Sequence, residues 1–280
     1  MHNFEYVVYS LTTRCNLDCL GCFRIGSNSS DTLPDTFLKI LPILKELGCK
    51  YLNLSGGEPL LNPYCSDLIS LCKKFDINPL LSTNGILLDN LDNNMLKGLK
   101  VLAIPLDGPN QSVNDEIRGS GHFAKVTSLI SEYRSRDYPF ILKVNTVVSV
   151  INHLYLDLIL QFFSEDSRII WKLFQISSRG NFNRFQRTGT IPTSKFLDIV
   201  RKLKENNAIK CRINYLCEED ALKYIIIDPE GNFYIPEGRN YSFIGNFRER
   251  NLVKKIINRN TSGNLFHEVV LGEKLNEKKF

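Results

Sequence analysis

The chain has 280 residues, 43% of them hydrophobic and 23% charged, as expected for a soluble globular protein with a sizeable core. Its formal net charge is +5, which does not indicate a nucleic-acid-binding protein but suits an anionic substrate. No run approaches the roughly 18 apolar residues of a membrane span, and the N-terminal residues do not resemble a signal peptide. We therefore expect a cytoplasmic protein with no membrane partner.

Apolar, β-branched runs alternate with amphipathic stretches over residues 1–208. Strands are predicted over 6–11, 50–55, 78–83, 100–106, 140–150 and 169–177, and helices over 33–48, 64–75, 91–99, 122–136, 153–165 and 192–206. The first helical stretch carries Phe37, Ile40, Leu41 and Leu44 at helical spacing, and the strands are apolar on both faces, as in helix-covered parallel sheets. Six strand–helix units are too few for a closed eight-stranded barrel, so an α/β fold, a partial (β/α)6 barrel, is predicted.

Residues 209–280 show a different pattern, which predicts a short C-terminal α+β extension packed on the barrel. The stretch KYIIIDPEGNFYIP predicts a hairpin whose turn lies at 229–232. A last helix is expected over 251–259.

Three cysteines lie close together directly after the first predicted strand, in TTRCNLDCLGCF at 12–23. In barrels of parallel strands, the loops at the carboxyl ends of the strands carry the chemistry. A structural zinc site needs four ligands, and no fourth Cys or His lies near Cys15, Cys19 and Cys22. A four-iron four-sulfur cluster, in contrast, can keep one iron open when the protein supplies three thiolates. The five other cysteines stand singly in apolar or helical patterns and are expected to be buried and inert.

Further polar or glycine-rich stretches follow the next strands. LSGGEPLLNP at 54–63 offers Gly56 and Gly57 for a close backbone approach and the Glu58 carboxylate, and it follows the second strand. STNG at 82–85 and LDG at 106–108 end the third and fourth strands, and NDEIRGSGHF lies beyond them.

Together these features resemble the radical S-adenosylmethionine (radical SAM) superfamily over residues 5–180: the Cys-x3-Cys-x2-Cys spacing, Phe23 after it, and the GGEP stretch after the second strand. The resemblance implies a single 4Fe-4S cluster held by Cys15, Cys19 and Cys22, with SAM at the open iron. It also implies an electron donor such as flavodoxin or ferredoxin, and reductive cleavage of SAM to a 5′-deoxyadenosyl radical that abstracts hydrogen from the substrate. The rival class is an iron–sulfur electron carrier, which would need neither GGEP nor LDG.

The resemblance also implies the residues that bind SAM. Glu58 corresponds to the residue that holds the amino group, Asn145 would reach the ribose hydroxyls, and Arg118 is a candidate for the carboxylate. The full set of implied cofactor-binding residues is Gly56, Gly57, Glu58, Thr83, Asn84, Asp107, Arg118 and Asn145. The alternative for Thr83 and Asn84 is that they only form a turn after the strand. The alternative for Arg118 is a solvated cation in a loop. Pro105 stands where many relatives carry a serine.

Three stretches, at 140–152, 169–175 and 224–236, resemble the viperin-like nucleotide dehydratases. That resemblance implies a small anionic substrate, such as a nucleoside triphosphate, bound by Lys143, Lys172 and Arg118. A buried ion pair remains the alternative for the two lysines, which stand in apolar strands. Tyr51 and Ile170 replace basic residues of viperin, and Arg179 and Arg184 are candidates to compensate. Modification of a peptide, a tRNA base or a cofactor precursor is the alternative activity.

Overall fold

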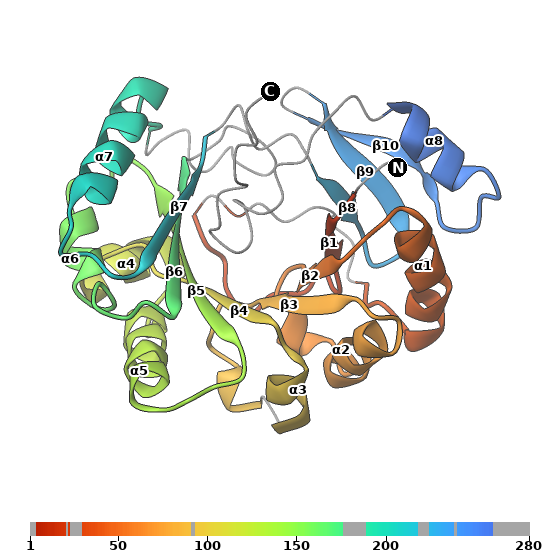
Figure 1. Ribbon diagram of the computed structural model, residues 1–280, viewed down its shortest axis with the longest axis horizontal. Helices are drawn as coiled ribbons and strands as arrows, with labels where there is room; N and C mark the ends of the chain where they lie inside the picture. Colours follow the sequence, from red (N-terminus) through yellow and green to blue (C-terminus); the bar gives the residue numbers. More distant parts are fainter. Residues whose placement is uncertain are drawn as a thin grey trace.

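The computed structural model describes residues 4–20, 22, 30–90, 93–175, 189–217, 224–237 and 240–259. These residues form a single ten-stranded sheet with the strand order β10-β9-β8-β1-β2-β3-β4-β5-β6-β7. The sheet is curved, and the helices lie along its outer side (Figure 1). None of the helices in the described ranges is long and apolar enough to cross a lipid bilayer.

Six strand–helix units build the centre of the sheet, as the sequence predicted. Their strands are β1 (Tyr6–Ser10), β2 (Tyr51–Ser55), β3 (Asn78–Ser82), β4 (Val101–Pro105), β5 (Ile141–Val148) and β6 (Ile169–Gln175). Their helices are α1 (Pro34–Glu46), α2 (Cys65–Lys74), α3 (Asn93–Gly98), α5 (His122–Ser135), α6 (Leu156–Leu160) and α7 (Thr193–Glu205). Each strand pairs in parallel with the next, so the partial (β/α)6 barrel is confirmed.

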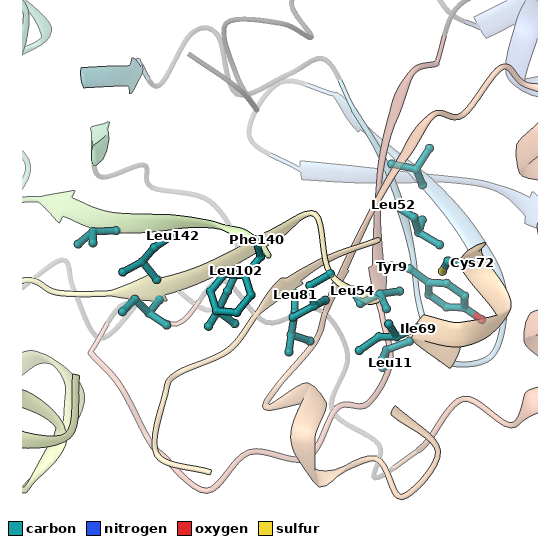
Figure 2. Close-up of a cluster of buried hydrophobic side chains, with 14 of the residues drawn as sticks. Tyr9, Leu11, Leu52, Leu54, Ile69, Cys72, Leu81, Leu102, Phe140 and Leu142 are labelled. Atoms are coloured by element: carbon teal, nitrogen blue, oxygen red, sulfur yellow. The ribbon is translucent and has the colours of Figure 1, made fainter. Parts of the chain in front are cut away.

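The two faces of the strands differ in chemistry. Alternate residues such as Tyr9, Leu54 and Leu102 point to the helices and are fully buried in the main core (Figure 2). Tyr9 stacks on Phe37 of α1 with ring centroids 5.3 Å apart. Burying side chains of this size stabilises the fold by about 1.5–3 kcal/mol each, which fixes the face that each strand turns to the helices.

The opposite face, here called the inner face, carries many polar side chains. Asn53, Ser82 and Lys143 occupy it, and the Ser82 hydroxyl donates to Asn53 Oδ1 at 2.8 Å. Strands apolar on both faces were expected, so this is a difference from the prediction. The partial barrel does not close on itself, and its interior side therefore does not have to be a packed apolar core.

The C-terminal part adds strands to both edges of the sheet. At one edge β7 (Arg212–Leu216) pairs in parallel with β6. At the other edge β8 (Ile225–Ile227) pairs in parallel with β1, followed by antiparallel β9 (Asn232–Glu237) and β10 (Asn240–Asn246). The predicted hairpin is confirmed between β8 and β9, and the predicted last helix is α8 (Leu252–Arg259). The division at residue 208 stays a prediction.

A further helix, α4 (Gln111–Arg118), begins where the sequence suggested only a ligand loop. The side chain of Asn110 caps it by accepting a hydrogen bond from Val113 N at 3.0 Å. Arg118 lies in its last turn, which places that side chain at the end of β4. Two short 3-10 helices, η1 (Pro59–Leu61) and η2 (Leu88–Asn90), complete the described elements.

Candidate cluster and cofactor site

The three clustered cysteines lie in the segment that follows β1, at the carboxyl end of the sheet. All three are free and partly exposed, whereas the other five cysteines are free and buried. Burial raises the pKa of the Cys15 thiol, and the nearby Cys19 and Cys22 thiols raise it further. The three sulfurs are therefore within electrostatic reach of one another.

The three free thiols match the number of protein ligands in a four-iron cluster that keeps one iron open. Within the described ranges, no three Cys, His, Asp or Glu side chains converge as ligands of one ion. In a four-iron cluster each thiolate binds a different iron, so the ligands surround the cluster instead of meeting at one point. Three free thiols on one loop supply this donor set. Phe23, which follows them, lies outside the described residues.

The GGEP loop docks on the segment that leads to Cys15. Gly57 N donates to Thr12 O, and Glu58 N donates to Arg14 O, both at 2.7 Å. A Cβ atom at Gly56 would lie 2.3 Å from Thr12 O, and one at Gly57 would lie 2.0 Å from Arg14 O. The backbone approach that requires glycine here is thus made to the cysteine segment, and contact of these glycines with SAM stays a prediction.

Glu58 is fully buried and joins the loops after β2 and β3. Its Oε1 accepts hydrogen bonds from Thr83 Oγ1 at 2.7 Å and Leu60 N at 3.1 Å, and its Oε2 accepts one from Asn84 N at 2.7 Å. Burial raises the pKa of this carboxyl, although the three donors favour the charged form. A carboxylate offers about four acceptor positions, so Oε2 keeps one for a further donor.

Asn84 extends this connection to the cysteines. Its side-chain Nδ2 donates to Asn16 Oδ1 at 2.7 Å and lies 3.9 Å from Cys15 Sγ. The STNG turn is therefore in contact with the cysteine segment, as a ligand loop at the same end of the sheet should be.

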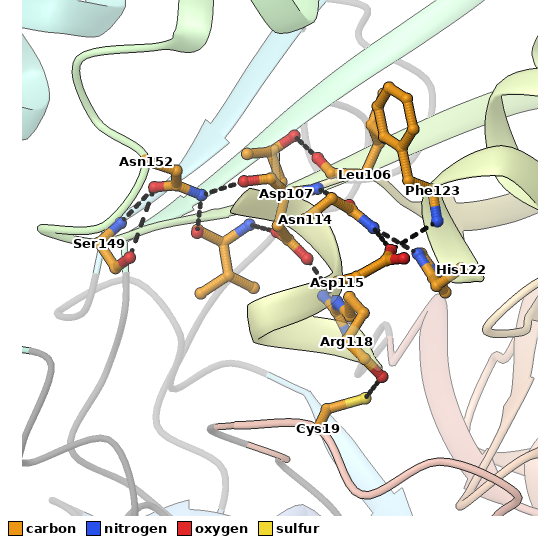
Figure 3. Close-up of polar contacts among 12 residues, drawn as sticks. Cys19, Leu106, Asp107, Asn114, Asp115, Arg118, His122, Phe123, Ser149 and Asn152 are labelled. Atoms are coloured by element: carbon orange, nitrogen blue, oxygen red, sulfur yellow. Dashed lines mark hydrogen bonds and ion pairs between the residues drawn. The ribbon is translucent and has the colours of Figure 1, made fainter. Parts of the chain in front are cut away.

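Asp107 and Arg118 form a buried pair beside Cys19 (Figure 3). Asp107 is fully buried, its Oδ1 accepts a hydrogen bond from Val147 N at 2.7 Å, and its Oδ2 pairs with Arg118 Nε. The Cys19 thiol donates to the Arg118 carbonyl at 3.6 Å. The last turn of α4 thus holds the cysteine segment, and its arginine is already engaged by a carboxylate.

The sequence reasoning missed three polar residues that support this pair. Asn114 Oδ1 accepts from Asp107 N at 3.0 Å, and Asn114 Nδ2 lies 2.9 Å from His122 Nδ1. Asn152 Nδ2 donates to Asp107 O and Val147 O, at 2.9 Å each (Figure 3). Burial lowers the pKa of His122 to about 4, so its ring is neutral at pH 7. The capping residue Asn110 was the signal that could have revealed α4 and with it Asn114.

The remaining predicted residues lie on the inner face of β5 and β6. Lys143 is 5% exposed and Lys172 is 1% exposed, and Asn145 is in register with Lys172. Within the described ranges, Lys143 Nζ makes no ion pair or hydrogen bond. Burial lowers the pKa of Lys143 to about 8, and burial together with the charge of Lys143 lowers that of Lys172 well below its ordinary value.

The structure therefore gathers the predicted residues into two groups. One surrounds the cysteines and contains Glu58, Thr83, Asn84, Asp107 and Arg118. The other contains Lys143, Lys172 and Asn145, whose Oδ1 is buried without a hydrogen-bond partner in the described part of the chain. Such an acceptor fits a hydroxyl donor, as the ribose of SAM would provide. Arg118 contacts Asp107 and not the lysines, and Arg179 and Arg184 lie outside the described residues.

The model of the Radical SAM superfamily matches residues 9–162, which contain the cysteines, the GGEP loop and the Asp107–Arg118 pair. The chain belongs to this superfamily. Its cofactors are accordingly a 4Fe-4S cluster and SAM, and a radical SAM enzyme also requires a reductant.

Relatives with assigned activities differ in how much of their length they share. An S-adenosylmethionine-dependent nucleotide dehydratase of Flammeovirga pacifica is 27% identical over 258 residues, 85% of this chain and 84% of its own. An AdoMet-dependent heme synthase of Methanosarcina barkeri is 31% identical over 52% of this chain, which spans only 43% of the synthase. A GTP 3′,8-cyclase of Clostridium perfringens is 31% identical, covering 72% of this chain and 63% of the cyclase.

Solved structures share the fold at low identity. Streptococcus suis SuiB bound to S-adenosylmethionine is 17% identical with a TM-score of 0.66, covering 90% of this chain and 65% of SuiB. The structure of anSMEcpe with bound AdoMet is 15% identical with a TM-score of 0.65, covering 91% of this chain and 77% of anSMEcpe. These similarities establish the partial barrel and its C-terminal antiparallel strands, and nothing about the substrate.

Proposed function

We propose that this radical SAM enzyme acts on a nucleotide, with nucleoside triphosphates as the first candidates. The observation that carries the proposal is the pair of lysines on the inner face. Lys143 and Lys172 are almost completely buried, and the positive charge of one lowers the pKa of the other.

Two buried ammonium groups near each other are costly to the ligand-free protein. Each loses its hydration, and the two repel each other. Lys143 has no carboxylate partner among the described residues, so the ion pair that was the alternative for this lysine is absent there. A phosphate group bound beside Lys143 would compensate its charge, and lysine is a common phosphate ligand.

The relatives support a nucleotide substrate. The Flammeovirga protein, a nucleotide dehydratase by name, aligns with most of both chains, and the cyclase is named for GTP. Two positions that are basic in viperin are neutral in this chain, where they are Tyr51 and Ile170. Ile170 lies in register with Lys143 on the neighbouring strand. The proposed phosphate site around Lys143 and Lys172 therefore has fewer cations than the site in viperin.

The residues around the cysteines would have separate tasks in this enzyme. Cys15, Cys19 and Cys22 would hold the cluster, and the spare acceptor position of Glu58 would bind the amino group of SAM. Asn145 would accept a hydrogen bond from its ribose, while Thr83, Asn84, Asp107 and Arg118 keep the surrounding loops in place. Together the cluster and SAM supply hydrogen-atom abstraction, for which an electron donor such as flavodoxin or ferredoxin would provide the electron.

The test is stimulation of SAM cleavage by nucleotides. The anaerobically reconstituted protein should form 5′-deoxyadenosine faster with one nucleoside triphosphate from a panel of CTP, UTP, GTP and ATP. Lys143→Ala and Lys172→Ala should each reduce this stimulation by about 10- to 1,000-fold, on the scale of a desolvated charge contact, and leave slow unstimulated cleavage intact.

Lys125→Ala is the matched control, because Lys125 pairs with the largely exposed Asp89 on the helix side of the sheet. It should behave like the wild type. A panel that stimulates nothing would refute the nucleotide substrate and leave the radical SAM chemistry standing. Peptides and cofactor precursors would then be the next substrates to examine.

A further inference from the structure

One inner-face row continues beyond the two lysine strands. Asn145 of β5 is in register with Lys172 of β6, and Lys172 is in register with Asn214 of β7. Residues in register on neighbouring parallel strands have their side chains on the same face of the sheet. Asn214 therefore stands beside Lys172 on the inner face, on the side away from Asn145.

Asn214 is buried but not satisfied. Only 8% of Asn214 is exposed, and its Nδ2 is buried without a hydrogen-bond partner in the described part of the chain. Buried amide groups are nearly always paired in native proteins, so an unpaired donor indicates a missing partner. The neighbouring Tyr215 packs on Phe196 of α7 on the opposite face, which fixes the orientation of the strand.

The surroundings of this donor are positively charged. In the adjacent row, Lys143 is in register with Ile170, and Ile170 with Arg212 of β7. The inner face of β5 to β7 thus carries Lys143, Lys172 and Arg212 around the amide of Asn214. A partner for a donor in such a place is an acceptor that carries negative charge.

We propose that Asn214 Nδ2 donates a hydrogen bond to a phosphate oxygen of the substrate, so that the anion site extends from β5 and β6 onto β7. This inference rests on the proposed function and adds a positioning residue to it. A lysine attracts an anion from any direction, whereas one amide donor selects the position of one oxygen. Asn214 also lies outside the matched residues 9–162, so it belongs to the part of the chain that the superfamily model does not describe.

The experiment measures equilibrium binding of CTP and of inorganic tripolyphosphate to the anaerobically reconstituted, SAM-loaded full chain. Asn214→Leu removes the donor at similar size and should weaken the binding of both ligands by about 5- to 30-fold. Asn214→Asp places a negative charge beside Lys172 and should weaken both by about 100-fold or more. Both variants should raise the melting temperature of the ligand-free protein.

Tyr215→Leu is the control on the same strand, because it alters packing on the helix side and should leave both affinities unchanged. If Asn214→Leu binds both ligands with wild-type affinity, this inference is overturned, and the proposed nucleotide substrate is not. Loss of CTP binding without loss of tripolyphosphate binding would show a contact to the nucleoside and also overturn it. If Asn214→Leu does not fold, wild-type affinity of Asn214→Asp for both ligands would overturn the inference instead. A wild-type protein that binds neither ligand would refute the nucleotide substrate and this inference together.

Discussion

Two groups of buried polar residues lie on the same sheet and differ in how they are paired. Around Asp107, at the end of β4, the carboxylate receives bonds from Val147 and Arg118, and the Asn114 and Asn152 amides are bonded to backbone around it. In the inner-face row, Asn145 Oδ1 and Asn214 Nδ2 are buried without partners in the described part of the chain. We infer that the bonded groups around Asp107 hold the loops in place, and we propose that Asn145 and Asn214 bind a ligand.

The three clustered cysteines are the predicted cluster ligands, and the largest effect is expected there. Cys19→Ala should abolish iron incorporation and SAM cleavage, because a cluster with two protein thiolates is not retained. Iron content, 5′-deoxyadenosine formation and the melting temperature of the apo-protein should be measured together. Cys72→Ala, in the core, should instead lower the melting temperature and keep the iron. Full SAM cleavage by the Cys19 variant would refute the cluster assignment.

The paired group is tested by Asp107→Asn. Removing one partner of a buried ion pair costs about 3–5 kcal/mol, and we expect about 2–4 kcal/mol here because 18% of the Arg118 side chain is exposed. The free energy of unfolding of the ligand-free protein, from urea denaturation, checks this. Asp89→Asn removes an exposed partner of Lys125 and should change stability by less than about 1 kcal/mol. Equal effects of the two changes would contradict a structural role for the Asp107 pair.

Removal of the Lys143 charge should change the stability in the opposite direction. Burial lowers the pKa of Lys143 to about 8 from its ordinary value of 10.5, so the folded protein favours the neutral amine. The contribution of that neutral amine to stability is present above pH 10.5 and is lost as the pH falls through 8. Lys143→Met should therefore be more stable than the wild type at pH 7, by an amount on the order of 2–3 kcal/mol.

The measurement is the free energy of unfolding of both ligand-free proteins between pH 7 and pH 10.5. The advantage of Lys143→Met should shrink as the pH rises, and Lys125→Met should show no such trend. A wild type that is the more stable protein at pH 7 would mean that Lys143 is already neutralised, and the comparison between the two groups would fail.

Much of the fold was predictable because its signals are local. Each strand–helix unit carries its own periodicity, as Phe37, Ile40 and Leu44 show for α1, and the β8–β9 hairpin carries its own turn residues. Helix α4 was missed because its sequence is polar and its cap, Asn110, is a single residue. The additions of β7 to β6 and of β8 to β1 depend on pairing between distant segments, which no local pattern encodes.

The candidate site also has parts that local sequence motifs predict and parts that depend on contacts between distant segments. The cysteine spacing and the GGEP loop are short motifs, so the sequence alone indicated the cluster and the cofactor. The support of Asp107 by Asn114 and Asn152 exists only after α4 and the end of β5 are brought together. Nothing in the stretch around Asn214 distinguishes it, and only the register of β7 with β6 places it beside Lys172.

The position of β1 has a consequence for how the protein is made. This strand leads into the cysteine loop and lies between β2 and β8, so one of its neighbours comes from the opposite end of the chain. During synthesis, the β1 edge that will receive β8 stays unpaired until residues 225–227 leave the ribosome, and an unpaired strand edge is a template for aggregation. The hairpin then also reaches the exit of the cysteine loop, where Thr32 Oγ1 donates to Pro229 O at 3.4 Å. Strand β1 is thus made before β8 but has both of its neighbours only after β8 has been made.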